Sequence, residues 1–473
     1  MTREAVVVLH DPAATQARRC IRAFHNGWGL PTVCLWTDDA VRRRDAWAHP
    51  VLRSDAVAEH VGAETADVDA TAAWLDAHYD VRAVVPWQEP TVGPAGALAA
   101  ALGLSWAQPD VLGLFRDKYA LKAHLRAVPG GPRVNVSAAV ATVEEVQAVV
   151  SAHDLDRYVL KPRDGYGNTG VTFLDKNSDP ALLRAALAAA GPSGLLLEDF
   201  IDGEEYYVNG QLDAVGRATV TRVARYLRGE VNGKANVELG VRLVRTTDPV
   251  FASLRDYAVE VTQATGLVRS PFHLEAKVDW QGPCLIEVGA RIMGGDPADE
   301  EGRVHNGGLD IFAVAAHYYL TDEDLGPLPL DWGRYDRFAF GRAIGVSRTS
   351  GRIKELSGVR EVEAMPEFVR WSIRPAVGDP LAPTVDIGAV PWNVTLEAPT
   401  DEALEEAAAK ARSLLRWNDR ATGLRRAVLG LVALLPGARR RLLRVRYERA
   451  TRPRRHVPAA PSPLTPSGAP AGR

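Results

Sequence analysis

The stretch YVLKPRDGYGNTGV, residues 158–171, carries the pattern that decides the fold. A short apolar run ends in Lys161-Pro162, three glycines follow, and the apolar pattern resumes at Val171. Glycines suit an ordinary hairpin turn, because they adopt backbone conformations that other residues avoid. They equally suit a flap whose backbone N–H groups bind phosphates, with Lys161 reaching the same anion. One glycine-rich loop does not separate these two interpretations, so the surrounding sequence has to decide.

The composition is that of an ordinary globular protein. The chain has 473 residues, of which 46% are hydrophobic and 24% charged, and its formal net charge is −3. This length predicts about two to four domains, and the near-neutral charge argues against nucleic acid as a partner. The cysteines Cys20, Cys34 and Cys284 have no CxxC spacing, which predicts neither a disulfide framework nor a zinc site and favours the cytoplasm. No apolar run reaches about 18 residues, so we expect no membrane span.

The N-terminal region alternates between strand and helix patterns. AVVVLH, LPTVCLWT and VRAVVPW read as buried strands, and helical stretches separate them. Such alternation predicts an α/β domain with an open parallel sheet over residues 1–115. No GxGxxG motif follows the first strand, which disfavours a dinucleotide-binding domain.

The rest of the chain divides by pattern into four further segments. They are a central segment with the glycine loop, a mostly strand-like core, a small β-rich unit closed by the helix TDEALEEAAAKARSLLRW, and a tail. The predicted boundaries are 116–193, 194–339, 340–415 and 416–473. The tail is rich in Arg and then in Pro and Ala. It is either a loosely docked helix with a solvated end or a basic segment that touches an anionic membrane surface or an acidic partner.

Two glutamates interrupt apolar strands near the middle of the core. Glu275 in FHLEAKV and Glu287 in CLIEVGA flank a Trp-Gln-Gly-Pro turn, so we predict a hairpin that carries both carboxylates. Buried carboxylates are costly unless a cation compensates them. Mg²⁺ takes one or two protein carboxylates and completes its shell with water and phosphate. The alternative is that each glutamate pairs with a nearby base such as Arg291 or Lys277. His273 alternates with Glu275 and is either a packed strand histidine or a neighbour of the metal.

Two more charged stretches accompany this pair and the glycine loop. DKYALK contains Lys118 and Lys122, and LLLEDFIDGEEYYV places several acids beside a strand. All four stretches occur in the order found in ATP-grasp carboxylate–amine ligases, and over residues 4–415 the chain resembles this family. It is most similar to the L-amino-acid (dipeptide) ligases and their biotin-carboxylase-like relatives. The resemblance implies an ATP-grasp fold with a central nucleotide-binding lid and a C-terminal α+β region.

The resemblance also implies roles for individual residues. Lys118 and Lys161 match phosphate-binding lysines, Glu198 matches the acid that binds the adenine amino group, and Glu205 matches the acid on the ribose. The implied nucleotide-binding set is Lys118, Lys161, Gly167, Asn168, Thr169, Gly170, Glu198, Ile201 and Glu205. Glu275 and Glu287 match the magnesium ligands, and Arg291 matches the arginine that steadies an acyl phosphate. Arg291 and Lys161 are therefore the expected catalytic residues, with ATP and Mg²⁺ (or Mn²⁺) as cofactors.

The sequence departs from the family pattern at two positions. Gly289 stands where the family usually has Asn, so one metal ligand is missing or comes from elsewhere, for example Asp296. Asn168 stands where the flap usually has Ser. Glu89, before a helix of the N-terminal segment, matches a family glutamate.

The expected function is ATP-dependent joining of a small carboxylate, such as an amino acid, to an amine through an acyl phosphate. The alternatives are carboxylase or carbamoyl-phosphate-type chemistry, a nucleotide-binding module without turnover, and a protein tethered through its basic tail. A homodimer is compatible with these expectations. The sequence does not name the two substrates.

Overall fold

The computed structural model describes residues 3–9, 15–36, 50–62, 67–104, 106–294 and 309–418. These residues lie within one unit, residues 1–418. The basic tail beyond Asn418 and the suggested metal ligand Asp296 lie outside the described residues. In the part of the chain that is described, no helix combines the length and apolar character needed to cross a membrane.

An open parallel sheet forms the N-terminal region, as the alternating pattern predicted. Its strands pair in the order β3-β2-β1-β4, and every pair is parallel. They are β1 (Arg3–Leu9), β2 (Thr32–Trp36), β3 (Val57–Gly62) and β4 (Tyr79–Pro86). The strand β1 is buried on both faces, because Val6 and Val8 belong to one hydrophobic core and Val7 belongs to another.

Helices cover both faces of the N-terminal sheet. On one face Leu75 of α3 (Val68–His78) and Leu98 of α4 (Val92–Ala101) join the core. On the other face α1 (Thr15–Trp28) packs against α11 (Ile311–Leu320). The shorter elements are η2 (Pro50–Arg53), η3 (Glu89–Thr91) and α5 (Pro109–Leu114). A helix from the C-terminal region therefore completes the N-terminal layer.

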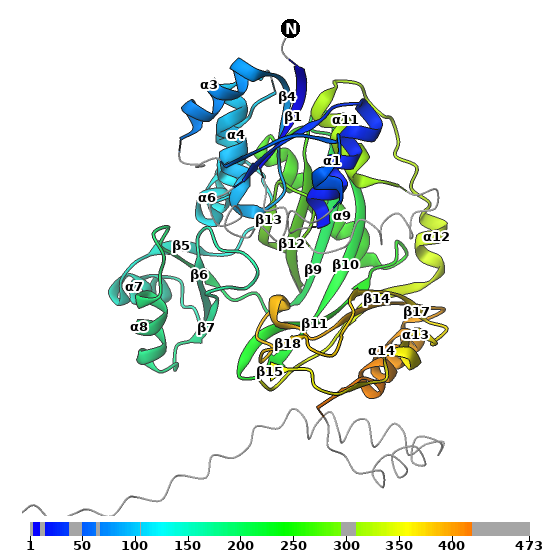
Figure 1. Cartoon of the computed structure of the whole chain (residues 1–473). Helices are drawn as coiled ribbons and strands as arrows, with labels where there is room; N and C mark the ends of the chain where they lie inside the picture. Colours follow the sequence, from blue (N-terminus) through cyan, green and yellow to red (C-terminus); the bar gives the residue numbers. More distant parts are fainter. Residues whose placement is uncertain are drawn as a thin grey trace, which may run out of the picture. The chain divides into compact units, whose positions relative to one another are not determined.

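A four-stranded antiparallel sheet forms the central segment. Its order is β5-β8-β6-β7. The strands are β5 (Ser137–Val140), β6 (Arg157–Pro162), β7 (Thr172–Asp175) and β8 (Leu195–Asp199). The helices α7 (Val143–Ala152) and α8 (Pro180–Ala188) lie together on one side of it (Figure 1). The boundary predicted at residue 193 is wrong in this respect, because β8 pairs with β5 and β6 and belongs to the central sheet.

An eight-stranded antiparallel sheet forms the C-terminal core. Its order is β13-β12-β9-β10-β11-β14-β19-β17. The strands are β9 (Glu204–Leu212), β10 (Ala218–Val231), β11 (Lys234–Leu243), β12 (Pro271–Asp279), β13 (Gly282–Gly289), β14 (Ala339–Ile344), β17 (Phe368–Ile373) and β19 (Asn393–Ala398). The helices α6 (Lys118–Ala127) and α9 (Pro249–Thr265) pack into its hydrophobic core through Leu121, Leu125 and Leu254. The helix α6 was predicted to belong to the central segment, but its apolar face is buried in this core.

The small β-rich unit extends the same sheet. Its strands β14, β19 and β17 continue from β11 by antiparallel pairing, so it shares one sheet with the core. The helix α14 (Asp401–Leu414) covers this end through Leu404 and Ala408, and its N-cap Thr400 accepts a hydrogen bond from Ala403 N. The remaining elements are α12 (Trp332–Arg337), α13 (Val359–Glu363), β15 (Gly351–Arg352), β16 (Leu356–Ser357), β18 (Pro380–Leu381), β20 (Arg416–Trp417) and η4 (Ile387–Ala389).

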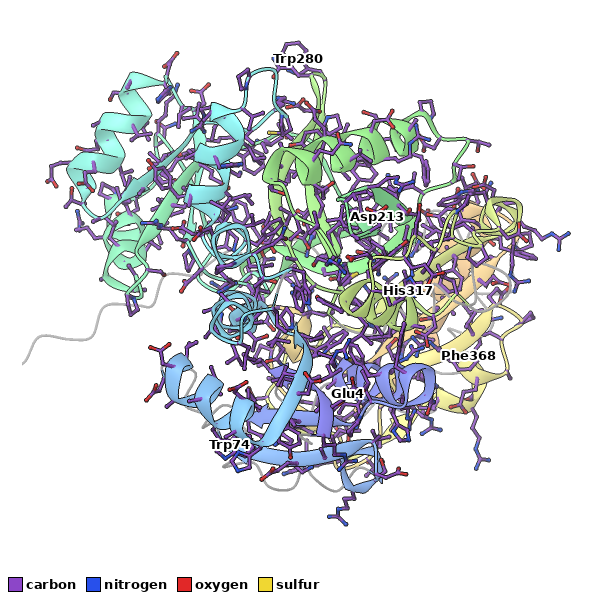
Figure 2. All side chains as sticks on the ribbon, turned by 90° about the horizontal axis from the view of Figure 1, so that it is seen from above. Glu4, Trp74, Asp213, Trp280, His317 and Phe368 are labelled. Carbon is purple, nitrogen blue, oxygen red and sulfur yellow. The ribbon has the colours of Figure 1, made fainter. Side chains whose placement is uncertain are left out.

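The predicted glutamate hairpin is present. The strands β12 and β13 pair antiparallel, and Glu275 lies directly opposite Glu287. Trp280 lies at the tip of the connecting turn, 90% exposed, and points away from the body of the protein (Figure 2). The sheet therefore presents two carboxylates on adjacent strands, far from the exposed turn that joins them.

Candidate active site

One cavity of about 360 Å³ collects the charged groups that the sequence singled out. Its walls come from the central sheet, the glycine loop, the C-terminal sheet and the segment after β18. Of the twelve predicted site residues, all except Gly170 line it, namely Lys118, Lys161, Gly167, Asn168, Thr169, Glu198, Ile201, Glu205, Glu275, Glu287 and Arg291. The structure thus brings the predicted residues together, and their individual roles stay predictions.

The glycine loop joins two strands of a hairpin and also lines the cavity, so the two interpretations of its sequence are compatible. The strands β6 and β7 pair antiparallel on either side of it. Gly167, Asn168 and Gly170 have φ values of 64°, 64° and 74°. A Cβ on Gly170 would lie 2.9 Å from Pro162 Cγ, so both its backbone conformation and its space require glycine. The loop is held at its tip, where Asn168 Nδ2 donates to the Asn236 carbonyl at 2.9 Å.

Lys161 and Glu198 form an ion pair on the wall of the cavity. They lie on the adjacent strands β6 and β8, with 2.6 Å between Lys161 Nζ and Glu198 Oε2. Lys122 Nζ contacts the other oxygen, Glu198 Oε1. Burial raises the pKa of Glu198, but the two ammonium groups outweigh burial and hold it below its usual value. Glu198 therefore remains a carboxylate although it is only 3% exposed.

The cross-strand pair Glu275 and Glu287 has unequal surroundings. Glu287 Oε2 lies 3.2 Å from Lys118 Nζ. Glu275 Oε1 accepts from the Tyr226 hydroxyl at 2.7 Å and contacts His273 Nε2 at 3.2 Å. Burial pushes the pKa of Glu275 up, but His273 and its other partners bring it down to about 2. Glu275 is therefore a carboxylate at neutral pH. The alternative interpretation had paired the two glutamates with bases such as Arg291 or Lys277, but Glu287 pairs with Lys118 and Glu275 contacts His273 and Tyr226.

The carboxylate pair fits a divalent cation that also binds phosphate. Residues directly opposite in an antiparallel pair have Cβ atoms about 5 Å apart, which lets two carboxylates share one cation. Among the described residues no cluster of three or more His, Cys, Asp or Glu side chains has the geometry of a metal site. A cation held by this pair would thus take its remaining ligands from elsewhere, which is the usual behaviour of Mg²⁺ at phosphate sites.

Arg291 pairs with the N-terminal region. Its Nε donates to Glu89 Oε2, and Arg116 Nη1 lies 3.3 Å from Glu89 Oε1. Gly289 makes room for this contact, because a Cβ there would lie 2.9 Å from Glu89 Oε2. Glu89 begins η3 shortly after β4, so the N-terminal region supplies the carboxylate that holds Arg291, which lines the cavity.

Glu205 and Ile201 also line the cavity. Glu205 Oε1 accepts from Arg228, and Asn236 Nδ2 donates to Glu205 Oε2 at 3.4 Å. The Ile201 carbonyl accepts from Lys277 Nζ at 3.2 Å. Glu205 thus has a guanidinium partner that the sequence interpretation did not foresee.

Several site residues escaped prediction. Lys122 was noticed in DKYALK but given no role, although it follows Lys118 by four positions, which places both on one helix face. Arg228, near the end of β10, was not singled out, and Asn236 was missed because the strand β11 was not predicted. The signal for that strand was Asn232-Gly233, which forms the turn between β10 and β11 with φ values of 51° and 76°. An Asn-Gly pair between strand patterns is the strongest short-range hairpin signal.

A glycine-loop lid facing a sheet with a cross-strand carboxylate pair is the arrangement of ATP-grasp proteins. Residues 157–299 match the ATP-grasp domain model, and residues 344–418 match L-amino acid ligase C-terminal domain 2. The chain therefore has an ATP-grasp fold, and its C-terminal part is similar to a domain of L-amino acid ligases.

Individual similar proteins agree with these two matches. Dapdiamide A synthase from Enterobacter agglomerans is 32% identical over 228 residues, which cover 46% of this chain and 53% of that protein, so the match spans about half of that relative. The L-amino acid ligase from Bacillus licheniformis superimposes with a TM-score of 0.65 at 17% identity, over 89% of this chain and 100% of that one. The biotin carboxylase domain of Hydrogenobacter thermophilus 2-oxoglutarate carboxylase, solved with MgADP and bicarbonate, gives a TM-score of 0.61 at 16% identity, over 88% of this chain and 91% of that one. At these identities the structural similarities establish the fold.

Proposed function

We propose that this protein is an ATP-dependent ligase that joins a carboxylate to an amine and releases ADP and phosphate. The observation that carries the proposal is the set of charged groups that meet at one cavity. Glu198 pairs with Lys161 on the central sheet, Glu287 pairs with Lys118 beside Glu275 on the C-terminal sheet, and Arg291 pairs with Glu89 of the N-terminal region. This set suits a nucleotide, its phosphates and an acceptor carboxylate.

The pair on the central sheet suits adenine. Adenine presents the N6 amino donor beside the N7 acceptor, whereas guanine presents two acceptors, O6 and N7. Glu198 is an acceptor and Lys161 a donor, 2.6 Å apart, so together they complement adenine, and the Glu198 carboxylate repels the O6 of guanine. This supports ATP as the nucleotide.

The chemistry needs little from side chains beyond position and charge. A substrate carboxylate attacks the γ-phosphorus of ATP, the bond to the β-phosphate oxygen breaks, and ADP leaves an acyl phosphate. The amine then attacks the acyl carbon, phosphate departs, and the amine gives up its proton. The residues Glu275 and Glu287 would hold Mg²⁺, which neutralises phosphate charge when bound. Lys118 and Arg291 would supply fixed positive charge to the phosphoryl group as it transfers, and Lys161, beside Glu198, would bind the base and the phosphate nearest to it.

Arg291 is well placed for an acyl phosphate because its orientation is fixed from outside. Glu89 holds Nε, and the Arg291 side chain is only 14% exposed. A guanidinium held on one edge can still donate from the other, which is the geometry that recognises phosphate. The N-terminal region would therefore help to build the acyl-phosphate end of the site.

The relatives suggest amino acids as substrates. Residues 344–418 match a domain of L-amino acid ligases, and one relative is a dapdiamide synthase. We propose that at least one of the two substrates is an amino acid. The cytoplasmic location and a homodimer, expected from the sequence, stay predictions.

The test is ADP release from MgATP across pairs of amino acids, with bicarbonate alone as a parallel arm. We expect release only with certain pairs, together with a product whose mass is the sum of the two less water. Arg291→Ala should bind ADP normally but lose ligation. Normal ADP binding would show that the variant is folded, so the loss of ligation would not come from a folding defect. Release with bicarbonate and no amino acid would favour carboxylase chemistry. If the protein binds ATP but releases no ADP with any pair, the result would favour the alternative of a nucleotide-binding module without turnover.

A further inference from the structure

Lys122 is a buried lysine that the proposed chemistry does not use. It lies on α6 and is 1% exposed. Its ammonium contacts three acceptors: Glu198 Oε1, Asn135 Oδ1 at 2.7 Å and the Leu285 carbonyl at 2.8 Å. An ammonium has three N–H donors, so this group is fully occupied and has none left for a ligand. Any effect of Lys122 on the cavity must pass through its partners.

Lys122 and Lys161 divide the Glu198 carboxylate between them. Lys161 Nζ contacts Oε2, while Lys122 Nζ contacts Oε1. Lys122 is anchored in turn by β13, through the Leu285 carbonyl, and by Asn135, whose Nδ2 donates to the Asp199 carbonyl at 2.7 Å. The hydrogen bond from Asn135 Nδ2 to the Asp199 carbonyl fixes the orientation of the Asn135 amide, so its Oδ1 faces Lys122. Glu198 is therefore tied to the C-terminal sheet on one side and to the ligand-facing lysine on the other.

Burying the Lys122 ammonium beside this ion pair costs free energy, which an apolar residue at the same position would avoid. Its presence therefore suggests a role other than stability. A lysine–carboxylate pair in a protein interior often contributes little net stability, because both groups lose their hydration. The pair Lys161–Glu198 would already be neutral by itself. Without Lys122, however, Lys161 could draw both oxygens of Glu198 onto its own ammonium. The carboxylate would then lose its fixed direction, and Lys161 would lose its reach toward a base.

We propose that Lys122 is a positioning residue that fixes Glu198 for the adenine amino group and thereby sets selectivity for adenine over 6-oxopurines. The inference rests on the proposed nucleotide site. It concerns only base recognition, so it does not depend on whether the bound nucleotide supports ligation.

The experiment measures dissociation constants for ADP and IDP, which differ at the 6-position of the purine. The proteins are full-length wild type, Lys122→Met, Glu198→Gln and the double variant, by calorimetry without amino acids. We expect Lys122→Met to weaken ADP binding and to reduce the IDP-to-ADP ratio of dissociation constants, each by about tenfold, the loss of one charged hydrogen bond. Lys176→Met is the matched control, because Lys176 pairs with Asp156 on the surface, at 60% exposure. It should keep the wild-type ratio.

The double variant distinguishes positioning from general destabilisation. If Lys122 acts through Glu198, removing it in the Glu198→Gln background should leave the ratio unchanged within about twofold. Additive losses, or a folded Lys122→Met protein with the wild-type ratio, would overturn the inference. If Lys122→Met does not fold, Lys122→Gln takes its place, since its amide can still donate to the Leu285 carbonyl. The wild-type protein could bind ADP more tightly than IDP and yet form no ADP from ATP with any pair of amino acids. That result would refute the proposed ligase function but would not contradict this inference about base recognition.

Discussion

At the scale of single residues, the position of Glu89 explains why residue 289 is a glycine. The family pattern expects Asn at position 289, and the sequence alone suggested a missing metal ligand. In the structure, a Cβ at Gly289 would lie 2.9 Å from Glu89 Oε2 and 3.5 Å from Arg291 Nε. Glycine therefore leaves the space beside Arg291 that the Glu89 carboxylate occupies. The departure from the pattern makes room for a contact between the N-terminal region and the core.

Gly289→Asn should impair this protein although it restores the usual residue. The new side chain would push Glu89 away from Arg291, and overpacking of this kind costs about 1–3 kcal/mol. We expect lower thermal stability and at least a tenfold loss of ligation, with ADP affinity nearly unchanged. Gly113→Ala is the control, because nothing lies within 4 Å of a Cβ there. A more active Gly289→Asn enzyme with higher Mg²⁺ affinity would show instead that a metal ligand was missing.

At the scale of elements, the hairpin of β10 and β11 connects three parts of the cavity wall. Its carbonyl at Asn236 accepts from the glycine-loop residue Asn168 at 2.9 Å. Near its turn, Asn232 Nδ2 donates to the Ser347 and Thr384 carbonyls at 2.9 and 3.0 Å. The hairpin thus holds the tip of the glycine loop and the segment that continues to Asp386 and η4, which also lines the cavity.

Asn168→Gly should loosen the glycine loop without straining it. Glycine accepts the φ of 64° at this position but lacks the amide that donates to Asn236. One neutral hydrogen bond contributes about 1 kcal/mol, so we expect ADP to dissociate about fivefold faster in stopped-flow measurements. The loop should also be cleaved faster by protease. Asn168→Asp is the companion variant, since its carboxylate would face the same carbonyl and should release ADP at least as fast. Wild-type release from both variants would mean that the contact does not hold the loop.

At the scale of the whole described molecule, the N-terminal region and the core are joined by charge as well as by apolar packing. Glu89 accepts from Arg291 and lies 3.3 Å from Arg116, while α11 packs against α1 and β4. Burial raises the pKa of Glu89, but Arg291 and Arg116 more than offset it, and the net shift is downward. The ionised form of Glu89 therefore stabilises the folded protein.

This contact predicts a particular dependence of stability on pH. A carboxyl group whose pKa is lowered by folding stabilises the protein above its unfolded pKa, about 4.3 for Glu, and loses that contribution as pH falls through the folded value. Glu89→Gln should lower the free energy of unfolding by about 3 kcal/mol at pH 7, because it leaves Arg291 without a charged partner. The difference from wild type should shrink below about pH 4 in denaturant titrations.

The matched control for this prediction is Glu4→Gln. Glu4 pairs with Arg82 on the surface of the same N-terminal sheet, at 52% and 46% exposure, and Figure 2 marks its position. An exposed pair of this kind contributes well under about 1 kcal/mol. Equal effects of the two substitutions, or a Glu89→Gln difference that does not change with pH, would contradict the assignment.

The sequence by itself determined the features that depend on near neighbours. The turn at Trp280-Gln281 predicted the hairpin and fixes its register as far as Ala276, because the register of a hairpin follows from its turn. A register shift between Glu275 and Ala276 then places Glu275 opposite Glu287. The same local rules predicted the glycine loop, the helix from Asp401 and the alternating N-terminal region. The strand β11 could have been predicted as well, since Asn232-Gly233 is a sequence signal for the hairpin turn that precedes it.

Only the tertiary structure decided which distant groups meet. Glu89 and Arg291 are 202 positions apart, and Lys122 reaches a carbonyl 163 positions away. The strand β8 likewise joins the central sheet by pairing with β5 and β6, although it follows a helix that seemed to close that segment. The sequence shows which side chains are charged, and each of these needs a partner if it is buried, because burial of an unpaired charge is costly. Which partner it finds depends on how whole sheets pack, and a pattern of residues along the chain does not contain that information.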